Sequence, residues 1–496
     1  MAVKVDTQKE IIFGSSDPNI SRVISKKKKD GELRKLAPRI YTTNLIDSPA
    51  NIVRRNLIEI LAYRYPNALI SHRSAKEMRP TSTGDFFLTN STTRRVTDLP
   101  GIILNFVKGP KATAHDIPFM GMHISGEHRY MLENMQLSRK SGDESRVLPI
   151  SVIENKLEQL LLTGGEERLN QYRDELREVA NELGMADEFS KINNIISALL
   201  STHDARVLST DSAKARASGN PFDANRVGLF EILFDTIKDR YFVIRNNRNT
   251  DEDSFRLFSF FESYFSNYIE GTEFDIEEAK EIVDSGIPMP RRDEDSHDIL
   301  GTFKILSNRT EMRRVPTSPE ELFAILSHRH TILLEGRLHM NPGVFKMRNN
   351  RAGQTEFVDY QLVKGTLSQG FKYYSALTDP FARAIFMMFM ISEVHPFNDG
   401  NGRIARVMMN AEFVRADQSR IIVPTVFRED YILALRKLTR HKDPMAYINV
   451  MTKLHQFSDN LYGTDFTELK NYLAACNAYE EPSQAKLQII DRSIRH

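Results

Sequence analysis

The chain has 496 residues, of which 41% are hydrophobic and 27% charged, and its formal net charge is +1. This length is more than one ordinary core requires, so we expect a multidomain protein with two or three domains. The composition is typical of a soluble globular protein, and the near-zero net charge excludes a strong overall attraction to nucleic acid or to membranes.

Cysteine usage and apolar segments indicate the compartment. Cys476 is the only cysteine, so no internal disulfide can form and a reducing compartment is expected. The first ten residues lack the apolar core of a secretory signal, and no apolar stretch approaches the roughly 18 residues that span a bilayer. We therefore expect a cytoplasmic protein that has no membrane partner.

The N-terminal segment is more basic than the rest of the chain. Residues 1–60 hold twelve Lys or Arg against seven Asp or Glu, and Lys26–Lys29 form an unbroken basic run. The pattern predicts a helix over residues 20–31, followed by a strand-like stretch over residues 33–43. This order is compatible with a helix and wing of a winged helix-turn-helix.

The following residues alternate between helical and strand-like patterns. A helix is predicted over residues 51–65, short strands over 68–75 and 86–90, and a long helical region over 151–200. The apolar stripe of that helical region consists of Leu169, Tyr172, Leu176 and Val179. We assign residues 1–205 to one mixed α/β, winged-helix-like domain.

The periodicity fails between Ser201 and Asn225, where the chain is rich in Ser, Ala, Asp and Asn and reaches a Gly-Asn-Pro turn signal. We place a linker at residues 206–224 and a mainly α-helical domain at 225–455. A C-terminal helical tail is expected over 456–496.

One break in the helical pattern falls near residues 345–367. The sequence MRNNRAGQTEFVDYQLV predicts a β-hairpin, with Asn349–Gly353 in its turn.

Two helices joined by a glycine-rich loop follow the hairpin. Asp379 and Pro380 form a typical helix start, and the residues up to Val394 are apolar on almost every face, as in a central bundle helix. Pro396 should end this helix. The second helix is predicted to begin near Arg403.

The residues between these helices suggest phosphate chemistry. Glycines before a helix start allow backbone N–H groups to approach an anion, and the helix dipole adds to the attraction. Arg403 and Arg406 lie on one helix face, and Asp399 offers an oxygen ligand for Mg²⁺. His395 supplies a base that is largely neutral near pH 7.

Together these residues read HPFNDGNGRIAR, which resembles the Fic signature HxFx(D/E)GN(G/K)RxxR at every fixed position. The resemblance covers residues 225–455. It implies a Fic helical bundle with a β-hairpin flap, in which His395 is the general base toward a Ser, Thr or Tyr hydroxyl and Asp399 holds Mg²⁺ on the phosphates of ATP. The residues that it implies for binding these phosphates are Gly400, Asn401, Gly402, Arg403 and Arg406.

The resemblance also suggests the reaction type and the target-docking element. Gly402 stands where family members that phosphorylate their targets carry Lys, which favours AMP transfer; Phe397 fits the position of a packing aromatic. The stretch Thr355–Val363 lies where the family has its flap, which pairs with the target segment, and Phe357 and Val358 are the expected docking residues. The alternative is an ordinary surface hairpin.

Many Fic proteins carry an inhibitory helix with the pattern (S/T)xxxE(G/N), whose glutamate pairs with the second arginine of the motif. The pattern occurs here twice. The first match consists of Ser266, Glu270 and Gly271, and the second of Thr331, Glu335 and Gly336. We choose the first, because it reads SNYIEGT, close to the usual SSxIEGT, and because an acidic capping box of Asp275 and Glu278 begins a new helix after it. We therefore expect Glu270 to pair with Arg406.

The N-terminal segment resembles AbiEi-type antitoxins, which are winged-helix proteins that bind their own promoter. This resemblance rests on residues 20–43 and 54–75 and implies DNA as a partner. A protein-interaction domain with a basic, solvated helix is an equal alternative.

The sequence thus predicts an autoinhibited protein adenylyltransferase that moves AMP from ATP, with Mg²⁺, to a hydroxyl of a target protein or of itself. One alternative is removal of AMP by the same site. Another, of a different class, is a DNA-binding regulator with a Fic sensor domain.

Overall fold

The computed structural model of the protein describes residues 9–200, 207–352 and 355–492. The chain divides into two compact units, Met1–Ser218 and Gly219–His496. This division falls within the range that the sequence suggests as a linker.

The N-terminal unit begins with a small antiparallel sheet. Its strands are β1 (Ile11–Phe13), β2 (Arg34–Ala37) and β3 (Ile40–Thr42), in the order β1-β3-β2. The predicted basic helix is observed as α1 (Pro18–Lys29), which begins behind the capping side chain of Asp17. Among the described residues α1 is the only helix between β1 and β2, whereas a helix-turn-helix needs two. The winged helix stays a prediction.

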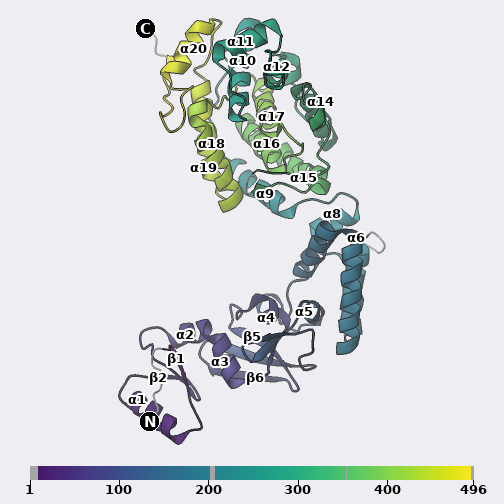
Figure 1. Cartoon of the computed structure of the whole chain (residues 1–496), viewed down its shortest axis with the longest axis vertical. Helices are drawn as coiled ribbons and strands as arrows, with labels where there is room; N and C mark the ends of the chain where they lie inside the picture. Colours follow the sequence, from purple (N-terminus) through teal and green to yellow (C-terminus); the bar gives the residue numbers. More distant parts are fainter. Residues whose placement is uncertain (1–8, 201–206, 353–354, 493–496) are drawn as a thin grey trace. The chain divides into compact units, whose positions relative to one another are not determined.

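A larger mixed sheet follows, in the order β6-β7-β5-β4-β9-β8. Its strands are β4 (Leu69–Ile70), β5 (Asp85–Asn90), β6 (Arg94–Leu99), β7 (Ile102–Lys108), β8 (Ile117–Phe119) and β9 (Met122–Ile124). The helices α2 (Pro49–Arg55) and α3 (Leu57–Arg64) share one apolar core with this sheet (Figure 1). The strand predicted over residues 68–75 is wrong after Ile70, because His72–Glu77 forms the helix α4. Arg73 of α4 is held by carbonyl groups from a distant loop, an interaction that local pattern cannot reveal.

The rest of the N-terminal unit is helical. It contains α5 (Glu127–Glu133), η1 (Gly142–Glu144), α6 (Ile150–Leu183), α7 (Ala186–Leu199) and α8 (Asp211–Ala217). The predicted stripe of Leu169, Tyr172, Leu176 and Val179 is buried in their common core, which confirms it. The helix α8 lies inside the range suggested as a linker, and it packs on α6 and α7. Ser212 and Arg216 of α8 both contact Glu158 of α6.

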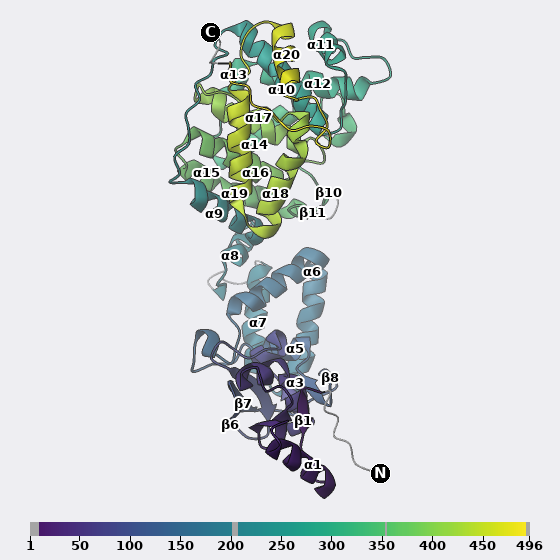
Figure 2. The same ribbon diagram turned by 90° about the vertical axis from the view of Figure 1, so that its left-hand side faces the viewer.

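The C-terminal unit is a helical bundle with one small hairpin (Figure 2). Its helices are α9 (Ala224–Ile237), α10 (Glu252–Ile269), α11 (Ile276–Ser285), α12 (Asp293–Leu306), α13 (Arg309–Met312), α14 (Pro319–Leu333), η3 (Leu338–Met340), η4 (Tyr360–Leu362), α15 (Val363–Ala376), α16 (Pro380–Val394), α17 (Asn401–Arg415), η5 (Thr425–Phe427), α18 (Arg428–His441), α19 (Pro444–Ser458) and α20 (Phe466–Ala475). The predicted central helix is confirmed as α16, which is capped by Asp379 and buried along nearly its whole length. It packs on α17, and the loop between them joins the two helices at one end of their contact.

The predicted hairpin is present but shorter than expected. Its strands are β10 (Arg351–Ala352) and β11 (Thr355–Glu356), paired antiparallel. Arg351 and Ala352, expected in the turn, belong to a strand, and Gly353 lies outside the described residues. The strand-like run to Val363 ends at Glu356, because the Asp359 side chain accepts a hydrogen bond from the Gln361 N–H and starts the turn η4.

The segment expected to be a C-terminal tail packs on the bundle. Phe466 of α20 stacks on Phe261 of α10, with ring centroids 5.8 Å apart. The hydroxyl of Tyr268 donates to Glu481 at 3.0 Å. No helix among the described residues is both long and apolar enough to cross a membrane.

Candidate active site

The loop between α16 and α17 is built on two unusual backbone positions. His395 ends α16 in the left-handed region, with φ 50° and ψ 62°. Gly400 ends the loop with φ 72°, where a Cβ would lie 3.1 Å from the Leu333 side chain. The following helix begins at Asn401, two residues before the predicted start at Arg403.

The imidazole of His395 is arranged to accept a proton on Nε2. Its Nδ1 lies 3.0 Å from the backbone oxygen of Ser392, so Nδ1 carries the hydrogen and donates it. Burial lowers the pKa of His395 to about 4; the nearby Lys346 contributes to this lowering, and the Ser392 carbonyl opposes it. The sequence-based expectation of a neutral base at pH 7 therefore agrees with this environment.

Buried side chains fix the shape of the loop. Phe397 is fully buried and stacks on His330 with ring centroids 3.7 Å apart, as expected of a packing residue. The Asn401 side chain accepts from the Phe397 N–H and donates to the Phe397 carbonyl, both at 2.9 Å. Asn401 thus closes the loop with its side chain, and only its backbone remains for an anion.

His330 of α14 is a residue that sequence reasoning missed. It accepts from the Gly343 N–H on Nδ1 at 2.9 Å, so Nε2 carries the hydrogen and donates to the Asp399 carbonyl at 3.0 Å. Burial lowers its pKa to about 4, which keeps the ring neutral. No local signal could have revealed it, because its partners are 69 and 13 residues away in the sequence.

Glu270 and Arg406 form the pair that the sequence predicts. Arg406 donates from Nη2 to Glu270 Oε1 at 2.7 Å and from Nε to Ser266 Oγ at 2.9 Å. Glu270 follows α10 directly, and Gly271 adopts φ 94° beside it. Burial alone would raise the pKa of Glu270, but Arg406 outweighs burial, and the pKa is lowered overall. The carboxylate is therefore ionised near neutral pH.

Gly402 makes room for this pair. A Cβ at residue 402 would lie 2.1 Å from Glu270 Oε1 and 3.2 Å from Arg406 Nη1. Residue 402 is the position from which the sequence analysis expects AMP transfer. A side chain there would also displace Glu270 from its place beside Arg406.

The second match to the inhibitory pattern lies elsewhere. Glu335 follows the end of α14, pairs with Lys304 at 3.0 Å and is 41% exposed. It does not line the pocket around His395. The geometry thus separates the two glutamates as the sequence analysis expects.

Arg403 is not placed like Arg406. Its Nη1 lies 2.8 Å from Asp298 Oδ2 and donates to Asn267 Oδ1 at 3.3 Å, and only 3% of its side chain is exposed. It does not line the pocket. Its guanidinium is thus held by a residue of α12, which a motif-based assignment cannot detect, and its Nη2 also lies 3.6 Å from the Asp399 carboxylate.

The pocket itself has a volume of about 440 Å³. It is lined by the loop, by the hairpin and by α18, and His395, Asp399, Gly402, Arg406 and Glu270 all border it. Arg436 and Arg440 of α18 add positive charge that the sequence analysis did not consider.

The residues present fit a Mg²⁺ ion shared with a nucleotide. The Asp399 carboxylate is 40% exposed and borders the pocket. Mg²⁺ in nucleotide sites is held by one or two carboxylates, with substrate phosphates and water as further ligands. Within the described part of the chain, no three His, Cys, Asp or Glu side chains form a metal site on their own.

The hairpin is tied to the same pocket. Phe357 stacks on His395 with ring centroids 3.5 Å apart, whereas Val358 is fully buried and does not border the pocket. Arg226 of α9 donates to the Glu356 carbonyl at 2.5 Å and pairs with Glu393 of α16 at 2.5 Å. Arg226 therefore joins the hairpin to the helix that ends at His395, a role that sequence reasoning missed.

Comparison with known proteins agrees with this geometry. Residues 318–412 match the family model described as Fic/DOC family. Protein adenylyltransferase fic-1 of Caenorhabditis elegans is 30% identical over 115 residues, which are 23% of this chain and 22% of that protein. Protein adenylyltransferase Fic of Nematostella vectensis is 24% identical over 214 residues, 40% of this chain and 47% of the relative. The chain therefore matches less than half the length of these relatives.

A solved structure of Fic-1 (residues 134–508) from C. elegans is similar at 17% identity and a TM-score of 0.36, covering 66% of this chain and 92% of that one. From the family match, the chain contains a Fic domain. Its homologues are named protein adenylyltransferases, which are nucleotidyltransferases.

Proposed function

We propose that this protein transfers AMP from ATP to a Ser, Thr or Tyr hydroxyl of a protein, and that Glu270 restrains this activity. The observation that carries the proposal is the 2.7 Å pair between Glu270 and Arg406, directly beside His395 and the glycine-rich loop. Arg406 is the arginine of the motif that borders the pocket, and Glu270 neutralises it.

In the proposed reaction the hydroxyl oxygen attacks the α-phosphorus of ATP. The bond from that phosphorus to the bridging oxygen breaks, and pyrophosphate leaves. The proton of the hydroxyl passes to His395 Nε2, which the hydrogen bond from Nδ1 to Ser392 leaves free to accept it. Phe357, stacked on the imidazole, covers the face that water would otherwise reach.

The loop would hold the phosphates through backbone N–H groups at the start of α17, with Gly400 and Gly402 allowing close approach. Arg406, once released, would bind the terminal phosphate. Asp399 would hold Mg²⁺, which neutralises charge on the phosphates when bound. Arg403, paired with Asp298, would orient the loop from inside rather than contact ATP.

The proposed restraint is competition for Arg406. A buried guanidinium needs a counter-charge, and either the Glu270 carboxylate or a phosphate can supply it. A hundredfold suppression requires only about 2.7 kcal/mol, within reach of one charge-assisted hydrogen-bonded pair.

The test is incubation of wild type, Glu270→Gly and Glu335→Gly with labelled ATP, Mg²⁺ and a cell lysate. We expect AMP on proteins, including the enzyme itself, to rise in Glu270→Gly alone. Glu335→Gly is the matched control, because Glu335 also ends a helix but pairs with Lys304 outside the pocket. Activation by Glu335→Gly, or no AMP transfer by any variant, would contradict the proposal.

Removal of AMP by the same site is a second candidate. It is favoured by the position of Glu270, whose side chain is 34% exposed and borders the pocket with His395, so that it could direct a water molecule. Wild type would then release AMP from an adenylylated protein, and Glu270→Gly would not.

The free, buried Cys476 supports a reducing compartment such as the cytoplasm for either activity.

A further inference from the structure

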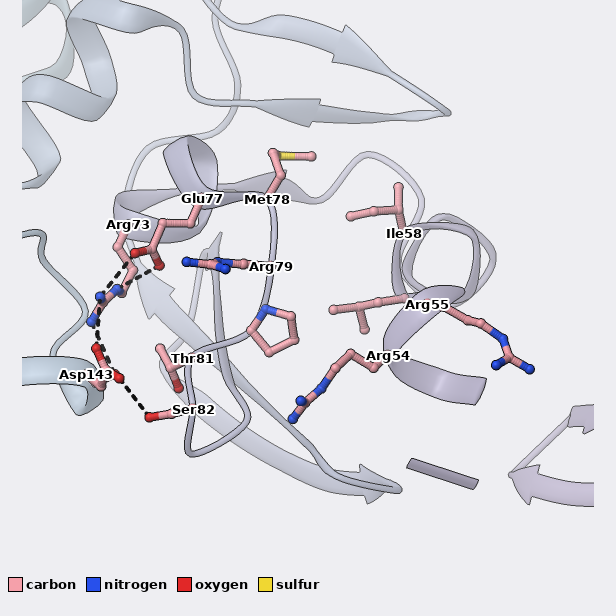
Figure 3. A pocket seen from close by; sticks show the side chains of 12 residues that line it. Arg54, Arg55, Ile58, Arg73, Glu77, Met78, Arg79, Thr81, Ser82 and Asp143 are labelled. Atoms are coloured by element: carbon pink, nitrogen blue, oxygen red, sulfur yellow. Dashed lines mark hydrogen bonds and ion pairs between the residues drawn. The ribbon is translucent and has the colours of Figure 1, made fainter. Parts of the chain in front are cut away.

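A second cavity lies in the N-terminal unit, outside the Fic domain. It has a volume of about 510 Å³, is open to solvent, and is lined by residues of α2, α3, α4, the loop after α4 and η1 (Figure 3). This volume is typical of pockets that bind small molecules. Its lining combines arginines with an apolar floor, which includes Leu57, Ile58 and Met78.

One wall of the cavity is fixed by Arg73. Its Nη1 donates to the carbonyls of Gly142 and Ser145, both at 3.0 Å, and its Nε donates to Glu77 at 3.0 Å. Only 6% of its side chain is exposed. Both Arg73 and Glu77 are thus satisfied by the protein, and Arg73 serves as a structural wall.

The loop after α4 is rigid. The Thr81 N–H donates to the Asp85 carbonyl at 3.0 Å, and the Asp85 N–H donates to Thr81 Oγ1 at 3.0 Å. Pro80 fixes one backbone dihedral of the loop. The backbone beside Arg79 is therefore restrained, and the exposed Arg79 side chain extends from it.

Two arginines of the cavity lack an internal counter-charge. Across the residues that the structure describes, no hydrogen bond or ion pair is found for the side chains of Arg54 and Arg79, which line the cavity from α2 and from the loop (Figure 3). Arg55, next in the chain, also lines the cavity, but its guanidinium points away from it in Figure 3 and pairs with Glu10 and Asp47. Two adjacent arginines on one helix thus have opposite surroundings.

We propose that this cavity binds a phosphate monoester, with Arg54 and Arg79 as the side chains that bind the phosphate and the organic part on the apolar lining. A guanidinium offers a fork of N–H donors that matches phosphate oxygens, and two such groups match its double negative charge. The carboxylate of Asp143 is engaged by Ser82 Oγ at 2.8 Å and lies near Arg73, so it does not neutralise this pair. The concave shape favours a small group over the backbone of a nucleic acid duplex.

The experiment is calorimetric titration of the full-length protein with phenyl phosphate, whose ring tests the apolar floor. We expect Arg54→Gln and Arg79→Gln each to weaken binding about tenfold or more, since a hydrogen bond to a charged group is worth about 1.5–3 kcal/mol. The control Arg55→Gln should bind within twofold of wild type. Phenol, which lacks the charge, should not bind.

Several results would overturn the proposal. The first is that wild type does not bind phenyl phosphate. The second is that Arg55→Gln loses as much affinity as the cavity variants, which would indicate general attraction by surface arginines. The third is that neither Arg54→Gln nor Arg79→Gln loses affinity. Arg54 and Arg79 are exposed, so the variants should melt at the wild-type temperature. If one of them melts at a lower temperature, the variants Arg54→Lys and Arg79→Lys replace it in the test. They keep the positive charge but lose the guanidinium fork, so they should bind phenyl phosphate less tightly than wild type. Affinity equal to that of wild type would contradict the proposal.

Competition against phenyl phosphate then distinguishes two sources of the same chemistry. AMP represents nucleotides, and an O-phosphotyrosine peptide represents modified proteins. Each is compared in wild type and in the Arg54→Gln/Arg79→Gln double variant, so that binding at the Fic pocket cancels. Displacement by either one in wild type alone supports the proposal and identifies the source; displacement by neither overturns it.

Discussion

The buried Arg406 of the Fic pocket has surroundings opposite to those of the exposed Arg54 and Arg79 of the N-terminal cavity. In the Fic domain Arg406 is buried and already has a counter-charge from Glu270, and Arg403 has one from Asp298. In the N-terminal unit Arg54 and Arg79 are exposed, and no ion pair is found for them within the described chain. A buried cation with an internal partner must exchange that partner for the ligand, whereas an exposed cation exchanges only water. The first arrangement can therefore be regulated from within the chain, and the second responds only to ligand concentration.

The largest expected effect is the loss of transfer in His395→Ala. General base catalysis contributes about 10²–10⁴-fold to a rate, so we expect AMP transfer to fall by at least a hundredfold. ATP binding should change less than threefold, because His395 faces the hydroxyl and not the phosphates. Both are measured in the Glu270→Gly background by label transfer and by calorimetry. A tenfold loss of ATP affinity in a folded protein would contradict this division of roles.

The next prediction concerns Gly402→Ala, which separates Glu270 from Arg406 without removing a charged group. Gly402→Ala places a methyl group 2.1 Å from Glu270 Oε1, so the carboxylate must leave Arg406. We expect auto-modification to rise about tenfold over wild type, less than in Glu270→Gly because the methyl also narrows the pocket. Gel-based detection of labelled AMP measures it. Wild-type activity in Gly402→Ala, combined with activation in Glu270→Gly, would show that Glu270 can move aside without releasing the site.

A smaller effect is expected from the contact that holds the hairpin. Arg226→Gln breaks the pair with Glu393 and weakens the bond to the Glu356 carbonyl. If the hairpin docks the target, KM for a protein target should rise about three- to tenfold while kcat changes little and ATP affinity is unchanged. Lys238→Gln is the control, because Lys238 directly follows the same helix, pairs with the exposed Asp235 and does not border the pocket. An equal fall of kcat in both variants would indicate a general loss of stability.

The smallest effect is the pH dependence of the released enzyme. Burial lowers the pKa of His395 to about 4, so the base is already neutral at pH 6 and gains nothing as the pH rises. Removing Glu270, which raises this pKa, should lower it further. We expect kcat/KM of Glu270→Gly to vary less than twofold between pH 6 and 8. An acid limb with a midpoint near 6.5 would show that His395 is solvated in the active state.

The parts predicted from sequence are those in which local pattern and geometry coincide. The ends of α16 and the capping box of Asp275 and Glu278 follow from neighbouring residues, whereas the burial of Phe397 was implied by the motif resemblance. The pair of Glu270 with Arg406 joins residues 136 apart, and the motif resemblance alone made it predictable.

The parts that were missed depend on distant partners. The motif predicts Arg403 as a phosphate ligand, whereas in the structure Arg403 pairs with Asp298 of α12. Residues 72–75 were predicted as strand, but they belong to the helix α4. The carbonyl groups that hold Arg73 of this helix come from residues 142–145, which a local pattern does not show. The burial of Val358 likewise depends on packing in the folded bundle that a local pattern does not show.

The neutral imidazoles of the Fic domain also bear on the environments in which the protein can survive. His330 and His455 are fully enclosed, each bonded to a backbone carbonyl, and burial lowers the pKa of each to about 4. Because the unfolded chain takes up a proton near pH 6.5 and the folded one does not, the stability they preserve at neutral pH is lost as the pH falls from 6.5 toward 4. For each ring, the free energy of unfolding falls by about 1.4 kcal/mol per pH unit over that window. The Fic domain should therefore be less stable in an acidified compartment than at neutral pH.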